Sequence, residues 1–260
     1  MAPDYATISW VEEGAIGRLT LNRPDKRNPI GPATCGELVH ALGRAREDPA
    51  MRVVVLSGAG AVFSAGGDLS QMAGGQAAEG AVAPASLVDL FTTMHELGKP
   101  IIAMVNGHAL AGGLGLVVAS DLAVASDQAT FGTTEIRVGL WPMMVSAELA
   151  RSIGRKHALD LMVTGRRISA AEALAMGLVN RVVPAASLEA ETLALAGEIA
   201  ELSPATMSLG LRAFYRAEDM ELGAALRFLE GQLGAVLGLE DAREGLAAFL
   251  QKRKPVWKGR

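Results

Sequence analysis

The residues best suited to chemistry lie between Gly112 and Glu135. Gly112 and Gly113 have no Cβ, so the backbone there can approach a ligand closely. The apolar run that follows, residues 114–119, can continue as a helix, whose first N–H groups point outward at the positive end of the helix dipole. That arrangement suits the stabilisation of a developing oxyanion. Glu135 follows among apolar residues, where a carboxyl group has a raised pKa and can serve as an acid or base near neutrality.

The segment before these glycines predicts a buried strand and a turn. Residues 101–105 are an apolar run, and Asn106-Gly107 marks a turn after them. No formally charged residue occurs from 100 to 120, which is long enough to span a bilayer. The Asn-Gly pair, His108 and four glycines interrupt that stretch, so we interpret it as a strand–turn–helix buried on all sides and predict no membrane insertion.

Composition excludes several classes of protein. A length of 260 residues allows one large α/β domain or two small ones. The net charge of −4 argues against general nucleic-acid binding. Cys35 is the only cysteine, so the chain forms no internal disulfide and gives no support for an oxidising compartment. The four histidines are scattered without metal-ligand spacing, so no metal site is predicted. The N-terminus lacks a charged-then-apolar signal segment, and a cytoplasmic location is the expectation.

The rest of the chain predicts an α/β core followed by helices. Residues 6–11 and 16–21 alternate and predict a β-hairpin. The later pattern predicts strands at 52–57 and 178–183, and helices at 32–47, 87–97, 147–153, 156–164, 170–175, 188–202, 204–216, 221–237 and 240–252. Ser203 suits the N-cap of one helix, with Pro204 at its first position. Strands alternating with helices, then a run of helices, indicate an α/β fold class with a helical C-terminal part.

Several ordered motifs resemble those of the crotonase family, the enoyl-CoA hydratase/isomerase group. They span nearly the whole chain and comprise residues 22–28, 63–69, 99–113, 131–139, 161–175 with 177–179, and 243–245. The resemblance implies a crotonase-like spiral of ββα units. Residues 1–185 would form the spiral core and residues 186–260 a helical trimerisation or capping region, within one integrated domain.

The resemblance also implies roles for individual residues. The backbone N–H groups of Ala65 and Gly112 would polarise the carbonyl of a coenzyme A thioester, with Glu135 as the catalytic acid/base. The coenzyme A portion of the substrate would be bound by Lys26, Arg27, Ala65, Gly66, Gly67, Asp68 and Lys252, and no other cofactor is implied. Asp68 equally suits a role in fixing its loop, and the basic C-terminal end equally suits a solvated helix end.

One departure from the family pattern bears on the reaction. Two-glutamate hydratases of this family carry a glutamate three residues after the oxyanion glycine, where this chain has Gly115. A single carboxylate favours an enoyl-CoA isomerase, which moves a proton within its substrate. An enoyl-CoA hydratase (a lyase) of fatty-acid or amino-acid breakdown is the alternative if His108 or Glu148 supplies the second acid. A non-catalytic acyl-CoA-binding or scaffold protein is a third interpretation.

Two further expectations concern the acyl chain and assembly. Residues 70–86, rich in glycine and alanine, are interpreted either as a loop over the site that admits different acyl chains or as a surface insertion without function. The helix at 221–237 carries apolar residues on more than one face and so needs burial on several sides. Together with the resemblance, this predicts a homotrimer or a hexamer.

Overall fold

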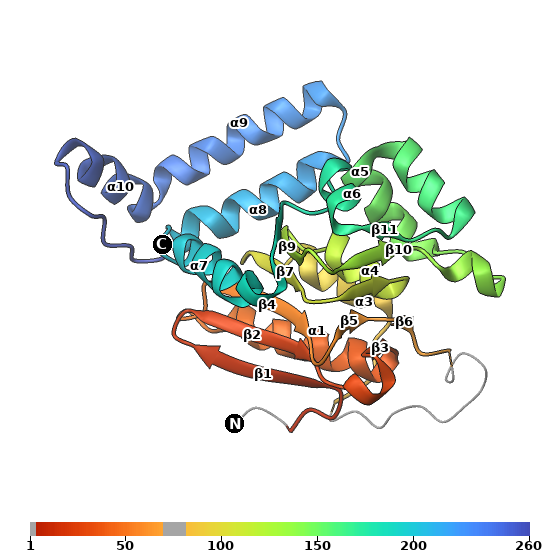
Figure 1. The fold of residues 1–260 in the computed structure, drawn as a ribbon. Helices are drawn as coiled ribbons and strands as arrows, with labels where there is room; N and C mark the ends of the chain where they lie inside the picture. The colour runs from red at the N-terminus through yellow and green to blue at the C-terminus, as the bar shows by residue number, and fades with distance from the viewer. Residues whose placement is uncertain (1–3, 70–81) are drawn as a thin grey trace.

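The computed structural model describes residues 4–69 and 82–260 (Figure 1). The predicted loop at 70–86 lies mostly outside the described residues. Its last part ends at Ser86, which accepts the N–H of Asp89 and begins helix α3 (Leu87–His95) with a capping box.

Within the described residues, the larger sheet has six strands. Its order is β1-β2-β4-β7-β9-β12, in which β1 and β2 form the predicted antiparallel hairpin and the other neighbours are parallel. Every residue of β4 and β7 is buried, because helices cover both faces of a largely parallel sheet. The strands are β1 (Ile8–Glu13), β2 (Ile16–Leu21), β4 (Val53–Gly58), β7 (Ile101–Val105), β9 (Leu122–Ser126) and β12 (Arg181–Val183).

The smaller sheets carry the chemically interesting segments. One has the order β11-β10-β8-β5, and the other pairs β3 with β6 in parallel. Within the first, β5, β8 and β10 are parallel neighbours, so their carboxyl ends meet at one edge. The strands are β3 (Pro29–Ile30), β5 (Val62–Ser64), β6 (Gly66–Gly67), β8 (His108–Leu110), β10 (Thr130–Gly132) and β11 (Ile168–Ser169).

Helix boundaries follow the sequence pattern with small differences. The two helices predicted at 147–153 and 156–164 belong to α5 (Met143–Thr164), which is interrupted at Gly154 (φ 73°, ψ 160°). The strand predicted at 178–183 is shorter in the structure and begins at Arg181; just before it, the Asn180 N–H donates to the Ala123 carbonyl and the Asn180 side-chain oxygen accepts the Ala123 N–H. The other elements are α1 (Pro32–Glu47), α4 (Gly112–Val118), α6 (Ala170–Ala175), α7 (Leu188–Ala200), α8 (Pro204–Glu218), α9 (Leu222–Gly238), α10 (Glu240–Leu250), and the 3₁₀ turns η1 (Pro24–Lys26), η2 (Glu135–Val138) and η3 (Ala185–Ser187).

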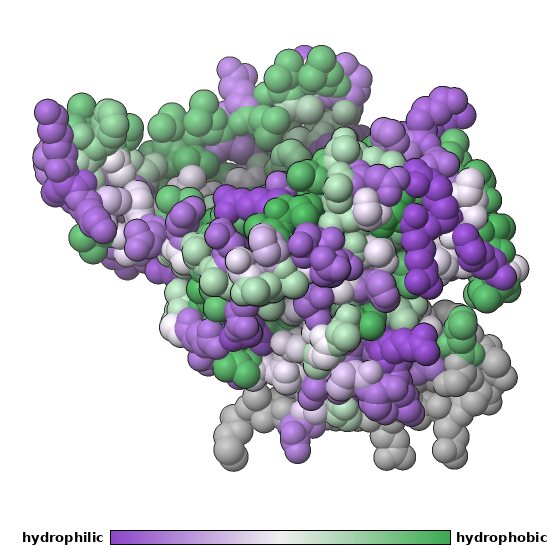
Figure 2. Space-filling model, viewed as in Figure 1, coloured by the Kyte–Doolittle hydropathy of each residue, from purple (hydrophilic) through white to green (hydrophobic). Residues whose placement is uncertain are grey.

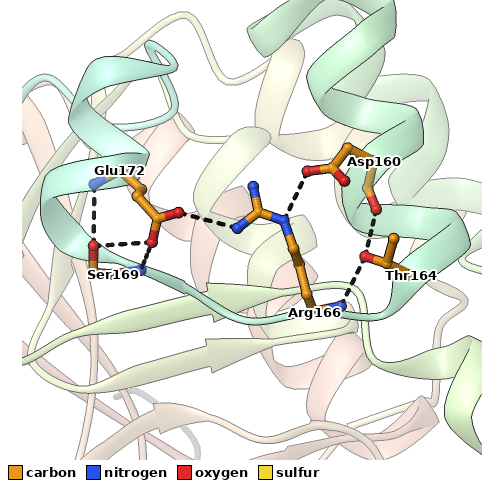
Figure 3. A network of polar contacts seen from close by, with 5 residues as sticks. All are labelled: Asp160, Thr164, Arg166, Ser169 and Glu172. Carbon is orange, nitrogen blue, oxygen red and sulfur yellow. Dashed lines mark hydrogen bonds and ion pairs between the residues drawn. The ribbon is translucent and has the colours of Figure 1, made fainter.

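A polar network joins the end of α5 to the start of α6 (Figure 3). The Arg166 guanidinium reaches Asp160 at 2.7 Å and Glu172 at 3.0 Å, and Glu172 forms a capping box with Ser169. The turn that this network closes contains Gly165, whose carbonyl accepts the Arg137 Nε–H at 2.7 Å. Since Arg137 belongs to η2, the network supports the segment that begins with Glu135.

Helices α9 and α10 stand apart from the sheets, whereas α7 packs on the larger sheet (Figure 1). Within α8, the predicted cap is present, because the Ser203 hydroxyl accepts the Thr206 N–H. In α9 no residue is buried, and hydrophobic residues gather along it in Figure 2. Among the described residues no single helix could span a membrane; only α9 and α10 taken together across a 72° bend match in length and composition. The predicted division at residues 185 and 186 stays a prediction.

Candidate active site

A cavity of about 440 Å³ opens at the carboxyl edge of β5, β8 and β10. Each of these strands is followed within a few residues by a residue that lines the cavity: Gly67 after β5, Gly112 after β8 and Glu135 after β10. Parallel pairing therefore brings together three segments that lie far apart in the sequence. The rest of the wall is mainly apolar and includes Ile30, Pro32, Leu87, Val138, Leu140, Trp141, Met143, Met144 and Val145.

The backbone turns sharply before Gly112. Ala111 has a φ of 52°, which is unusual for a residue with a side chain, and its N–H donates to the Gly132 carbonyl at 2.8 Å. This bond links the start of α4 to the end of β10. Gly112 is the first residue of α4, so its N–H has no partner within the helix. A Cβ at position 112 would lie 3.8 Å from the Gly67 nitrogen, so the backbone of Gly67 lies close to that of Gly112.

The hydrogen bonds of residues 65–68 contradict the predicted role of Ala65. The Ala65 N–H donates to the Arg27 carbonyl at 2.9 Å, and the Gly66 N–H to the Ser64 hydroxyl at 3.1 Å. The Asp68 N–H donates to the Ile30 carbonyl at 3.1 Å. Among the loop and side-chain hydrogen bonds of the described residues, none uses the Gly67 N–H. Ala65 lines the cavity, but its N–H is already paired, which argues against Ala65 as the first oxyanion donor.

Glu135 is positioned as an acid or base. It lies at the cavity wall, and its Oε2 atom is buried without a hydrogen-bond partner among the described residues. Burial raises the pKa of its carboxyl group, as the apolar sequence around it predicts, against a smaller opposing effect of its own backbone. A carboxylate left unpaired at a cavity wall is available to take a proton from a bound molecule.

The two candidates for a second acid lie elsewhere. His108 is exposed and shares a hydrogen bond of 2.8 Å with the Thr130 hydroxyl. Glu148, one turn beyond Val145 on α5, pairs with His95 at 3.3 Å and does not line the cavity. Of the carboxylates that the structure describes, Glu135 alone lines the cavity. Cys35 also lines it, but burial raises its pKa to about 12, which keeps the thiol neutral.

The residues predicted for coenzyme A are only partly near the cavity. Lys26 and Arg27 are exposed on η1 and its cap, and the Arg27 carbonyl accepts the Ala65 N–H. Asp68 is buried and pairs with Arg23 at 3.4 Å, which agrees with a role in fixing the loop. Lys252 is exposed beyond the end of α10. None of Lys26, Arg27 and Lys252 lines the cavity.

Gly115 occupies the position of the absent glutamate, and its surroundings could not be read from the sequence. It is buried in α4 and faces the side chains of Phe91, from α3, and Val145, from α5. The described residues also contain no cluster of three or more histidine, cysteine, aspartate or glutamate side chains that could hold a metal ion.

Comparisons with known proteins agree over almost the full chain. The sequence profile of the enoyl-CoA hydratase/isomerase family matches residues 11–260. The human enoyl-CoA hydratase domain-containing protein 3, mitochondrial, is 39% identical over 93% of this chain and 80% of its own length.

Solved structures give the same result for the fold. An enoyl-CoA hydratase from Mycobacterium smegmatis superimposes with a TM-score of 0.88 at 34% identity, covering 97% of this chain and 99% of that one. An enoyl-CoA hydratase from Bacillus anthracis gives a TM-score of 0.88 at 34% identity, covering 98% and 100%. The predicted α/β crotonase fold is therefore confirmed.

Proposed function

The chain belongs to the enoyl-CoA hydratase/isomerase family, and from this premise we propose that it acts on an enoyl-CoA thioester through an enolate. The N–H groups of Gly67 and Gly112 would hold the thioester oxygen, and Glu135 would carry the proton. In better-studied enzymes each such oxyanion donor contributes about 2.7–4 kcal/mol to transition-state stabilisation. The coenzyme A is part of the substrate, and no separate cofactor is proposed.

The observation that carries the reaction type is the unpaired Glu135 carboxylate at an otherwise apolar wall. In a 3-enoyl thioester, Glu135 takes a proton from the carbon next to the carbonyl, and the electron pair moves onto the oxygen as an enolate. The protonated carboxyl then returns the proton two carbons along, which leaves a 2-enoyl thioester. Both steps use one carboxyl group and no second reactant, so this geometry favours isomerisation.

Hydration is the second candidate, and the comparisons support it better than isomerisation. The relatives described above are named for enoyl-CoA hydratase and not for isomerase. Addition of water requires one group to orient and deprotonate the water and a source of the proton for the carbon next to the carbonyl. Glu135 would have to serve both needs in sequence. A non-catalytic acyl-CoA-binding or scaffold protein is the least favoured interpretation, because it has no use for a half-buried carboxylate with an unpaired oxygen.

A turnover assay with purified protein distinguishes the two reactions. We offer 3-enoyl-CoA and 2-enoyl-CoA thioesters of several chain lengths and measure isomerisation and hydration side by side. Isomerisation faster than hydration is the expected result, with loss of both in Glu135→Gln. Hydration that outpaces isomerisation in the unmodified enzyme would reverse our preference, and coenzyme A binding without turnover would establish a non-catalytic acyl-CoA-binding protein.

The remaining proposals concern the coenzyme A portion and the location. The exposed Lys26 and Arg27 beside the loop of residues 65–68 provide positive charge for its phosphates, with Lys252 as a further candidate from the C-terminal end. Relatives come from bacteria and from mitochondria, and we propose the cytoplasm for this chain.

A further inference from the structure

We infer that Phe91 and Val145 determine which reaction this site performs, because they fill the space through which a side chain at position 115 would reach the cavity. This inference rests on the proposed function, since it concerns how the Glu135 site divides between proton transfer and addition of water. Three elements meet at this point: Gly115 in α4, Phe91 in α3 and Val145 in α5.

The contact at Gly115 is closed to any larger residue. A Cβ there would lie 2.8 Å from Phe91 Cζ and 2.9 Å from Val145 Cγ2, closer than real Cβ contacts. Neither neighbour can move into solvent, because Phe91 is 6% exposed and Val145 is 3% exposed. The glycine and the two apolar side chains therefore form one packed unit, in which each member depends on the others.

This unit reaches the cavity through one of its members, Val145. Val145 lines the cavity directly, as does Leu87, one turn before Phe91 on α3. An aromatic ring and a valine methyl group offer no hydrogen bond to water. A stably bound water needs two to four polar partners, so this side of the site cannot hold one in a fixed position. Glu135 then has no water oriented opposite it, and the proton it removes returns to the substrate.

The packing claim is tested first by stability. Gly115→Glu alone should lower the melting temperature by several degrees, because the new side chain overpacks a buried contact. Phe91→Ala should recover part of that loss when it is combined with Gly115→Glu, since it removes the ring that the new Cβ meets. Met94→Ala is the matched control: Met94 is buried on the same helix but is not among the atoms nearest to Gly115. Protein concentration is held constant throughout.

The reaction claim is tested by the ratio of hydration to isomerisation in the same variants. We expect this ratio to rise at least about tenfold in the Gly115→Glu/Phe91→Ala double variant, because a carboxylate and the room for a water are both supplied. Phe91→Ala and Val145→Ala alone should raise the ratio less, since they supply space for a water but no carboxylate. Met94→Ala alone should leave the ratio within about twofold of that of the unmodified protein. Met94→Ala combined with Gly115→Glu should leave it within about twofold of that of Gly115→Glu alone.

The possible failures can be told apart. The proposed function fails if the unmodified protein neither isomerises 3-enoyl-CoA nor exchanges the proton next to the thioester carbonyl with deuterated water, and the inference fails with it. If the unmodified protein does either, an unchanged ratio in the folded double variant overturns the inference alone. Recovery of stability by Met94→Ala as large as that by Phe91→Ala would also overturn it.

Discussion

Glu135 combines burial with an unpaired oxygen, and both properties are visible in the pH dependence of catalysis. Burial raises the pKa of Glu135, and a base must be ionised to act. We therefore expect kcat/KM to rise with pH on an acid limb whose midpoint lies above the ordinary pKa of a glutamate. Glu135→Gln should lower kcat/KM by about 10²–10⁴-fold. Glu191→Gln, at an exposed position in α7, is the matched control and should leave the pH profile unchanged. An unchanged acid limb in Glu135→Gln would show that another group titrates.

Gly112 is the second residue whose replacement has a defined consequence. The Cβ of a valine would lie 3.7 Å from Ile30 Cδ1 and 3.8 Å from the Gly67 nitrogen, where the thioester oxygen is expected. Gly112→Val should thus remain folded and lose at least about 10²-fold in kcat. Gly43→Val in α1 is the control, because a Cβ at Gly43 meets nothing within 4 Å. Unchanged turnover in a folded Gly112→Val protein would disprove the assignment.

Single residues also show what the sequence could and could not predict. Gly112 and Glu135 are recognisable because the motifs around them are distinctive. In the other motif the resemblance implied Ala65 as the donor, and the sequence could not show that the Ala65 N–H donates to the Arg27 carbonyl, which is a tertiary contact. Phe91 was missed for the same reason, since only packing of α3 against α4 brings it to Gly115.

At the scale of elements, α3 and α5 are joined by a half-buried ionic contact as well as by the cavity they both line. His95 at the end of α3 lies 3.3 Å from Glu148 in α5, and its ring stacks on Tyr215 at 4.4 Å between centroids. The Tyr215 hydroxyl donates to Asp121 at 2.7 Å. Glu148 raises the pKa of His95 against the opposing effect of burial, so the folded protein holds this proton more tightly than the unfolded chain does.

This contact predicts a pH dependence of stability. Because the pKa of His95 is raised in the folded protein, its contribution to the free energy of unfolding is fully present below the unfolded histidine pKa of about 6.5. That contribution is lost as pH rises through the pKa of the folded state. Urea unfolding measured over this pH range should show the free energy of unfolding falling in the unmodified protein and falling less in Glu148→Gln. His157→Gln, an exposed histidine on the same helix, should behave as the unmodified protein. An equal fall of the free energy of unfolding with pH in Glu148→Gln and in the unmodified protein would refute the linkage.

Elements were predicted more completely than their arrangement. Helix periodicity and caps such as Ser203 are local, so the helices at α1 and α6 to α10 were placed within a few residues. Strand pairing is not local, and the small sheet β11-β10-β8-β5 has strands of only two or three residues that carry little pattern. That sheet nevertheless assembles the site. None of its strands was predicted from the sequence, and the family resemblance implied only a spiral of ββα units.

At the scale of the whole molecule, α9 presents an apolar stripe that this chain leaves uncovered. Its leucines at 222, 226, 229, 233 and 237 recur every three or four residues, and each is between 38% and 71% exposed. Such spacing places them on one side of the helix. Phe214 of α8 and Phe249 of α10 are also exposed, at 62% and 81%. Figure 2 shows this hydrophobic surface along α9. Exposed apolar surface of this extent is typical of a protein interface.

We therefore propose that copies of this chain cover the stripe in a homotrimer, alone or paired as a hexamer. Full burial of each leucine is worth about 1.5–3 kcal/mol, so the stripe can hold an assembly together at micromolar concentration. Light scattering should give a mass three or six times the 27.0 kDa of the chain. Leu229→Glu/Leu233→Glu should reduce that mass, because two charges would be buried unpaired at the contact. Val11→Glu is the control, since Val11 is 52% exposed on β1, outside the C-terminal helices. A monomer in the unmodified protein, or an intact oligomer in the α9 variant, would contradict this assembly.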